Sequence, residues 1–287
     1  MNFKGKKILG LMVSCVLAGS LLAGCGGEQQ AAKEPQKTVR VGMIANMNAN
    51  EKAYNEIMEK VEEESGVKLS VPHVYTYYDS MNAMQMGLES KSIDEMSTYK
   101  KVAEYIIAHK NNLAVVDHKG MKLKDNFCLA LRKDDTALKE RLDSALKEMK
   151  ADGTLDKIKE DFVTNLKPGT EPPAVAIPKT EGADTLKVAV TGDMPPIDLI
   201  LANGTPAGFN TAVLAELGKR LGMNVELVSL ESGARAAALT SKRVDVIFWA
   251  VSPVPGDSRP ADMDVPGGAA LTEPYYEDEI FHVALKK

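Results

Sequence analysis

Apolar and polar positions follow two periods along the chain. Short apolar runs typical of buried strands alternate with longer segments in which apolar residues recur every three or four positions, as on one face of a helix. The predicted strands are 39–44, 71–77, 93–96, 127–132, 186–191, 225–229, 244–249 and 280–285. The predicted helices are 53–64, 80–90, 100–108, 135–150, 155–162, 211–221 and 234–241. This alternation predicts βαβ units, and therefore an α/β fold with mixed, mainly parallel sheets.

Two interruptions divide this pattern. Residues 166–184 hold four prolines and lack apolar periodicity, which indicates a linker between two α/β parts. Between the helices 135–150 and 155–162 lies Ala151-Asp152-Gly153-Thr154. We expect Gly153 to end the first helix and Thr154 to be the N-cap of the second.

The N-terminus has the pattern of an export signal. A lysine-rich start precedes an apolar run from Ile8 to Ala23, which is shorter than the ~20 residues that a membrane-spanning helix needs. The run ends in Leu22-Ala23-Gly24-Cys25, which resembles the lipobox of bacterial lipoproteins. The resemblance implies that Cys25 becomes the first mature residue and carries lipid. We therefore expect a protein anchored to the outer face of the cell membrane.

Charge and the numbers of cysteines and histidines limit the ligands and cofactors that we expect. A net charge of −5 gives no support to nucleic-acid binding. Of the three cysteines, Cys128 stands in an apolar run typical of a core strand, so we expect no disulfide framework. The four histidines lack metal-ligand spacing, and we expect neither a metal nor a cofactor.

Residues 185–287 contain an ordered set of motifs. Pro195-Pro196 is followed by Gly208-Phe209-Asn210, and the next helix ends in Arg220-Leu221-Gly222. Val244-Asp245-Val246-Ile247 and Thr272-Glu273-Pro274-Tyr275-Tyr276 come after it. This set resembles the first lobe of the family 3 extracellular solute-binding proteins, the receptors of polar amino-acid ABC transporters.

The first part of the chain resembles the other half of the same family. Ser92-Ile93-Asp94, the run from Leu129 to Asp135, and Ala151-Asp152-Gly153-Thr154 match the second lobe, a hinge strand and the terminal helices. The resemblance implies a two-lobe, type II periplasmic-binding-protein-like fold with a hinge. The halves stand in inverted order, as a circular permutation would produce; the alternative is a fusion of two truncated receptors.

The resemblance gives the expected domains. They are a signal peptide (1–24), a tether (25–38), a second-lobe-like domain (39–126), a hinge strand with terminal helices that pack on the other lobe (127–165), the linker (166–184), and a first-lobe-like domain ending in a hinge strand (185–287).

The resemblance also implies a ligand cleft between the lobes. Arg259, after Ser252, stands near the position of the arginine that binds the ligand's α-carboxylate, and Arg235 at that of an arginine that contacts a second carboxylate. The alternatives are a solvated loop arginine and a helix-surface arginine. Tyr99 stands where a carboxylate pairs with the ligand's ammonium, so that clamp is expected to be lost. The candidate ligand-binding residues are Arg259, Arg235, Ser252, Ala250, Met194, Asn48, Tyr99 and Trp249.

The resemblance implies a solute-binding function. We expect a lipid-anchored, extracytoplasmic protein that captures a small polar, carboxylated solute, an amino acid or a dicarboxylate, by lobe closure. It would deliver the solute to the permease of an ABC importer. Two alternatives stay open: a sensor or interaction protein that has lost its ligand, and an enzyme of the dehydratase or lyase type.

Overall fold

The computed structural model describes residues 38–287 except 46, 48–50, 66–70 and 119–121. The signal peptide, Cys25 and the candidate ligand residue Asn48 therefore lie outside the described residues. All described residues belong to one compact unit.

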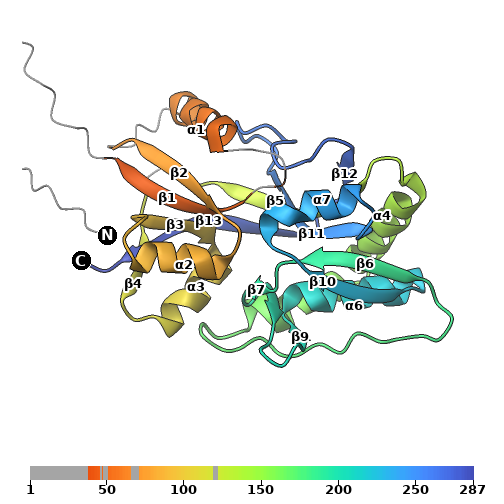
Figure 1. Cartoon of the computed structure of the whole chain (residues 1–287). Coiled ribbons are helices and arrows are strands. Elements are labelled where there is room, and N and C mark those ends of the chain that lie inside the picture. The colour runs from red at the N-terminus through yellow and green to blue at the C-terminus, as the bar shows by residue number, and fades with distance from the viewer. Residues whose placement is uncertain (1–37, 46, 48–50, 66–70, 119–121) are drawn as a thin grey trace, which may run out of the picture. The chain divides into compact units, whose positions relative to one another are not determined.

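A mixed sheet of ten strands organises this unit (Figure 1). Its order is β10 (Asn224–Ser229), β6 (Thr185–Val190), β11 (Val246–Pro253), β5 (Lys124–Arg132), β13 (Tyr276–Leu285), β3 (Glu95–Tyr99), β1 (Val39–Ile44) and β2 (His73–Tyr78). Two short strands lie off this path, β12 (Ala269–Leu271) beside β5 and β4 (Leu113–Val116) beside β13. Parallel pairs form the two flanks, whereas the centre is antiparallel. The predicted α/β class with mixed sheets is confirmed. The expectation that the sheets are mainly parallel was wrong, because among the described strand pairs of this sheet four are parallel and five are antiparallel.

Strand β13 joins the two flanks. Its first part, Tyr276 to Glu279, pairs with β5, and its second part, Ile280 to Leu285, pairs with β3 and β4. The sheet therefore has one half built from β1 to β4 and another built from β6, β10 and β11, with β5 and β13 between them.

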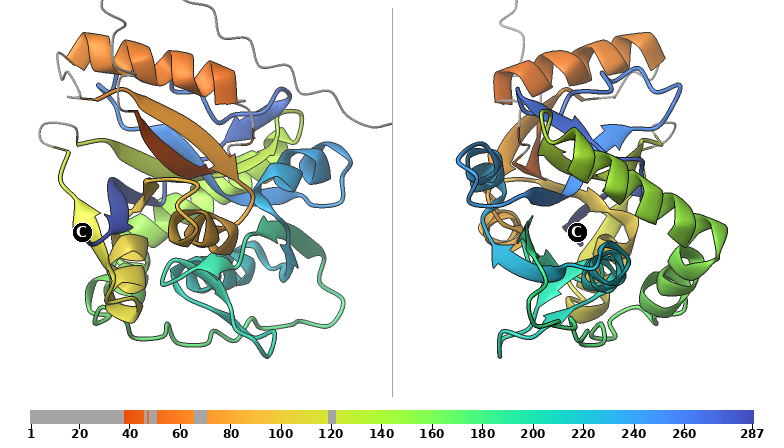
Figure 2. Two further views of the ribbon diagram at one scale, coloured as in Figure 1. Left: turned by 60° about the vertical axis from the view of Figure 1, so that its left-hand side comes forward. Right: turned by 90° about the vertical axis from the view of Figure 1, so that its right-hand side faces the viewer.

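Helices cover both faces of the first half (Figure 2). Val41 of β1 packs against Tyr54 and Met58 of α1 (Glu51–Ser65). The neighbouring residue Gly42 points to the other face, under α2 (Met81–Glu89), where an added Cβ would lie 3.0 Å from Met84 Cγ. Glycine thus allows α2 to approach the strand closely. On the same side, α3 (Lys100–His109) contacts β3 and β13.

The second half is also covered by helices. Helix α6 (Phe209–Leu221) contacts β10 and also α4 (Thr136–Ala151) and α5 (Thr154–Lys159), which is followed by a π-helical turn over Glu160–Thr164. Helix α7 (Arg235–Thr240) contacts β11 and β5. One main cluster of buried apolar side chains includes residues of both halves, such as Met84 and Phe209.

Several boundaries differ from the prediction. Strand β4 was not predicted, because four residues give too little periodicity to recognise. Gly153 has a φ of 77° and follows the C-cap of α4, as expected, but it is itself the N-cap of α5. The prediction that Thr154 is the N-cap was wrong: Thr154 begins α5, and its N–H donates to Asp152 Oδ1 at 3.0 Å.

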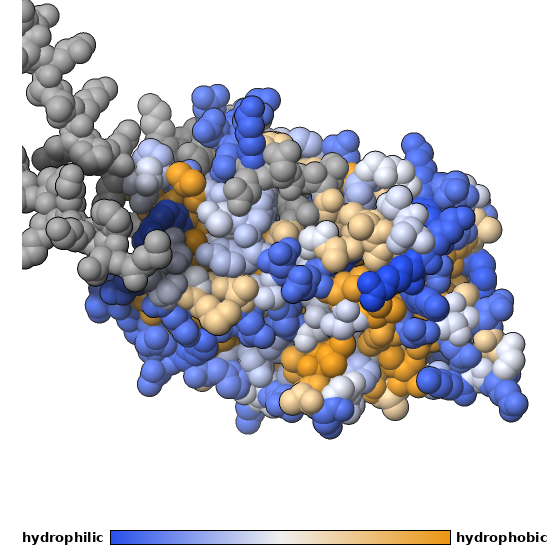
Figure 3. Space-filling model, viewed as in Figure 1, coloured by the Kyte–Doolittle hydropathy of each residue, from blue (hydrophilic) through white to orange (hydrophobic). Residues whose placement is uncertain are grey.

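The linker runs along the second half without a helix. Its Val175 N–H donates to Pro206 O of the short strand β9 (Pro206–Ala207), which pairs with β8 (Asp198–Ile200) and through it with β7 (Asp193–Met194). Apolar surface gathers in this region (Figure 3), where a hollow is lined by residues that include Ile177 and Leu227. The linker is thus hydrogen-bonded to the half of the protein that follows it in sequence.

Candidate functional site

A cavity of about 70 Å³ lies between the two halves of the sheet. Its lining residues come from β1, α1 and β3 on one side, from α7, β11 and the loop after β11 on the other, and from the two connecting strands. They are Met43, Ile44, Ala45, Tyr54, Ser97, Thr98, Tyr99, Asp125, Arg235, Trp249, Val251, Arg259, Met263, Asp264 and Ile280.

Trp249 forms an aromatic wall. The pairing of β11 with β5 shifts register between Ile247 and Ala250, and Trp249 in this irregularity has a φ of 63°. A bulge re-aims the side chain it carries, and a positive φ is unusual for a bulky residue. The indole stacks on Phe127 at a centroid distance of 5.8 Å and meets Tyr99 edge-on at 5.7 Å. Trp249 therefore belongs both to the core and to the cavity.

Arg259 lies in the cavity wall with its charge already paired. Its side chain is 1% exposed. Nε and Nη2 donate to Asp257 Oδ1 and Oδ2 at 3.0 and 2.8 Å. Nη1 lies 2.9 Å from Asp125 Oδ1, and Nη2 also donates to the Lys124 carbonyl at 2.8 Å. The alternative of a solvated loop arginine is wrong.

Arg235 is the less neutralised of the two arginines. It is 3% exposed, so the alternative of a helix-surface arginine is wrong. Its Nη1 donates to the carbonyls of Phe248 and Trp249 at 3.3 and 3.0 Å, and Nε donates to Ser232 O at 3.2 Å. Among the described residues, no carboxylate lies within the 4.0 Å of an ion pair with this guanidinium. Burial lowers the pKa of Arg235, against the opposing charge of Asp264.

Two buried aspartates complete the polar lining. Asp125 Oδ2 accepts a hydrogen bond from Tyr99 Oη at 2.7 Å, and Asp264 Oδ1 accepts one from Met47 N at 2.5 Å. Burial raises the pKa of Asp125, although Arg259 opposes the shift. Burial likewise raises the pKa of Asp264 to about 6, against the charge of Arg235. The cavity thus combines cationic and anionic groups in a site largely withdrawn from water.

The structure brings four of the eight candidate residues to this cavity: Arg235, Arg259, Tyr99 and Trp249. The other three described candidates do not line it. Met194 is 1% exposed in the main core, and Ala250 is 0% exposed in a second apolar cluster on the opposite side of β11. Ser252 is paired with Asn126 of β5 in the sheet.

Sequence reasoning missed Asp125 and Asp264. Asp125 is the second residue of β5, just before the apolar run that was recognised, and a carboxylate next to a buried run was an available signal. Asp264 stands in an irregular loop rich in proline and glycine, where no periodicity marks a side chain as buried. Cys128 is 2% exposed, which confirms its prediction as a core residue.

The sequence matches one family. The description of that family is bacterial extracellular solute-binding proteins, family 3, and the matched residues are 54–165 and 186–267, more than half of the chain. The chain belongs to the bacterial extracellular solute-binding proteins of family 3. The recognised resemblance is thereby confirmed. A comparison with curated proteins gives no match.

Solved structures of binding proteins resemble the chain more distantly. A zinc-bound ligand-binding component of an ABC-type import system from Staphylococcus aureus has 12% identity and a TM-score of 0.42, over 87% of this chain and 66% of that one. The holo arginine-binding protein ArgBP of T. maritima has 13% identity and a TM-score of 0.36, over 87% and 83%. The alkanesulfonate-binding protein SsuA of Xanthomonas axonopodis pv. citri, bound to MOPS, has 11% identity and a TM-score of 0.40, over 89% and 67%.

The chain spans slightly less than two thirds of the length of the Staphylococcus aureus protein. Among the described residues, no helix has both the length and the apolar character that crossing a membrane requires.

Proposed function

We propose that this protein is a receptor that binds a small polar, carboxylated solute in the cavity between its halves and delivers it to an ABC importer. The observation that carries the proposal is Arg235. Its guanidinium is buried beside the cavity and bonded only to neutral oxygens among the described residues. A buried cation without an anionic partner favours an anionic ligand group, and a guanidinium binds a carboxylate through paired, charge-assisted bonds.

The acidic lining favours an amino acid over a dicarboxylate. A second ligand carboxylate would meet Asp125 and Asp264, and like charges in a low-dielectric cavity repel. A ligand ammonium would instead be attracted to the same two groups. In this arrangement Arg235 binds the carboxylate and Asp264 the ammonium, which replaces the clamp expected to be lost at Tyr99. Trp249 supplies the aromatic wall.

Lining residues from both halves favour capture by lobe closure. A solute that touches Ser97 or Tyr99 on one side and Arg235 on the other stabilises the closed arrangement over the open one. The proposed partner, an ABC permease, would then recognise the closed form. The protein would act as a carrier and not as an enzyme.

Thermal shift against a library of amino acids and dicarboxylates tests this proposal. A stabilising solute present at 100 times its dissociation constant adds about 2.7 kcal/mol to the free energy of unfolding. Arg235→Ala should remove the shift, whereas Arg243→Ala, a matched change of an exposed arginine in the same half, should preserve it. If no solute stabilises the chain, the receptor proposal fails and a sensor or interaction protein replaces it.

We also propose that the halves are circularly permuted. Val283 pairs with Met96 of β3, and Met96 pairs with Gly42 of β1, so the end of β13 lies at the same end of the sheet as the start of β1. Two strand spacings, about 10 Å, separate these strands. About three extended residues span that distance, so the chain could have run directly from β13 into β1 in an ancestor.

Membrane attachment through Cys25 is part of the same proposal. Cys25→Ala should release the protein from the membrane fraction and prevent incorporation of labelled fatty acid. Cys15→Ala, a change of the preceding cysteine in the apolar run, should leave both unchanged. Equal membrane retention of the two variants would contradict the lipid anchor.

A further inference from the structure

Three of the four histidines of the chain converge although they are far apart in sequence. His73 begins β2, His282 is in the second part of β13, and His118 follows the end of β4 by two residues. Glu95 begins β3 between them. The spacing of these residues along the chain gave no sign of the cluster.

The sheet register places the side chains of His73, Glu95 and His282 on one face, and His118 follows the neighbouring strand β4. Val39 pairs with His73 and Val41 pairs with Glu95, and residues two apart in a strand share a face. His282 pairs both with Ser97, two residues after Glu95, and with Val116, two residues before His118. The convergence therefore follows from the strand order and not from a flexible arrangement.

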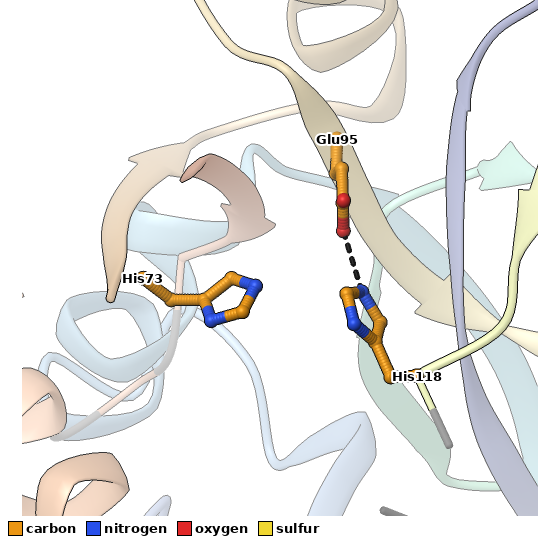
Figure 4. A group of neighbouring side chains, drawn as sticks. All are labelled: His73, Glu95 and His118. Atoms are coloured by element: carbon orange, nitrogen blue, oxygen red, sulfur yellow. Dashed lines mark hydrogen bonds and ion pairs between the residues drawn. The ribbon is translucent and has the colours of Figure 1, made fainter. Parts of the chain in front are cut away.

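The distances within the cluster are short. Nε2 of His118 lies 2.7 Å from Glu95 Oε2, and Nδ1 of His282 lies 2.9 Å from the same oxygen. The imidazoles of His73 and His118 meet edge-on at a centroid distance of 5.3 Å, with His73 facing the pair formed by Glu95 and His118 (Figure 4). One donor atom from each of His73, Glu95 and His118 lies within 4.8 Å of the others.

We propose that His73, Glu95 and His118 bind a divalent transition-metal ion, and that Zn²⁺ is the ion that fits best. Two imidazoles and a carboxylate match the nitrogen and oxygen ligands of zinc, whereas Ca²⁺ and Mg²⁺ prefer sets made of oxygen alone. Three protein ligands leave a fourth tetrahedral position for water.

The cluster needs only a small adjustment to hold the ion. Ligands about 2.0–2.1 Å from a tetrahedral zinc are about 3.3 Å apart, so the bond between Glu95 and His118 must open slightly and His73 must move inward. His282 then keeps its bond to Glu95 and orients the carboxylate, as the outer partners of metal ligands do.

The site lies at the opposite end of the strands from the solute cavity. His73 and Glu95 are at the starts of β2 and β3, whereas the ends of β1 and β3, at Ile44 and Tyr99, line the cavity. A bound ion would tie together β2, β3 and the segment after β4, and through His282 it would hold β13. We therefore expect it to stabilise the first half without entering the solute site.

Equilibrium dialysis of the metal-stripped full chain against ZnCl₂, followed by elemental analysis, tests the proposal. We expect one zinc ion per chain. His118→Ala and Glu95→Gln should each weaken binding by at least tenfold, and Glu95→Gln keeps the size and hydrogen bonding that folding requires. His109→Ala is the matched control, because this exposed ring bonds to Tyr105 O on α3, outside the cluster, and its loss should leave binding unchanged.

Thermal unfolding provides a second readout. Zinc at 100 times its dissociation constant should raise the midpoint of the original chain and of His109→Ala by about 5–10 °C, and should not raise that of Glu95→Gln. The absence of a stoichiometric ion, or equal losses in His109→Ala and His118→Ala, would overturn the proposal. A circular dichroism spectrum identical to that of the original chain establishes that each variant is folded.

Discussion

The pairing of Arg259 permits a quantitative prediction. Its guanidinium is buried between Asp257 and Asp125, whose side chains are 7% and 6% exposed. Arg259→Ala leaves both carboxylates without their cation inside the protein. Breaking a buried ion pair by removing one partner costs about 3–5 kcal/mol, because the remaining charge keeps its desolvation penalty. We expect a loss of this size in the free energy of unfolding.

Urea unfolding followed by tryptophan fluorescence measures this loss, because Trp249 is the single tryptophan of the chain and lies beside the network. Arg243→Ala is the matched control and should change stability by less than about 0.5 kcal/mol, since it is an exposed arginine. In an Asp257→Asn background the same removal of Arg259 should cost less, because one charge fewer is left unpaired. A loss no larger than that of the control would refute the pairing and return Arg259 to the role of a free ligand clamp.

Two further predictions concern the cavity and the chain order. Because burial raises the pKa of Asp264 from 3.8 to about 6, its ionisation opposes folding, and the original chain should lose up to about 3 kcal/mol relative to Asp264→Asn between pH 4 and pH 7. Parallel pH profiles in urea unfolding would contradict this burial. A chain reordered so that 185–287 precedes 38–166, with a short glycine linker between them, should fold with the same circular dichroism spectrum. An unfolded or aggregated product would contradict the permutation.

Much of the fold follows from the sequence because its elements obey local rules. Strand β1 and helix α6 are recognisable from apolar spacing, which reflects burial on one or both faces. Elements without such spacing were missed or misplaced. Strand β4 is too short to show an apolar period. At the start of α5 the N-cap is Gly153 with its left-handed backbone, and not the threonine that follows it.

The site was only partly predictable, for a physical reason. Motif positions identified Arg235 and Arg259, but the groups that each guanidinium contacts can lie up to 134 positions away, as Asp125 does from Arg259. The histidine cluster was not predicted for the same reason. Its members become neighbours only when β13, near the end of the chain, enters the sheet beside β3. Sequence spacing carries no record of such contacts.

The central claim is that the cavity binds a carboxylated solute, and fluorescence titration tests it most directly. Trp249 lines the cavity, and Arg235 lies 6.0 Å from its ring, so ligand binding there should change its emission. Titration with the most stabilising amino acid should give a saturable change at one solute per chain, abolished by Arg235→Ala and preserved by Arg243→Ala. Binding that leaves the emission of Trp249 unchanged, or that survives the loss of Arg235, would contradict the account.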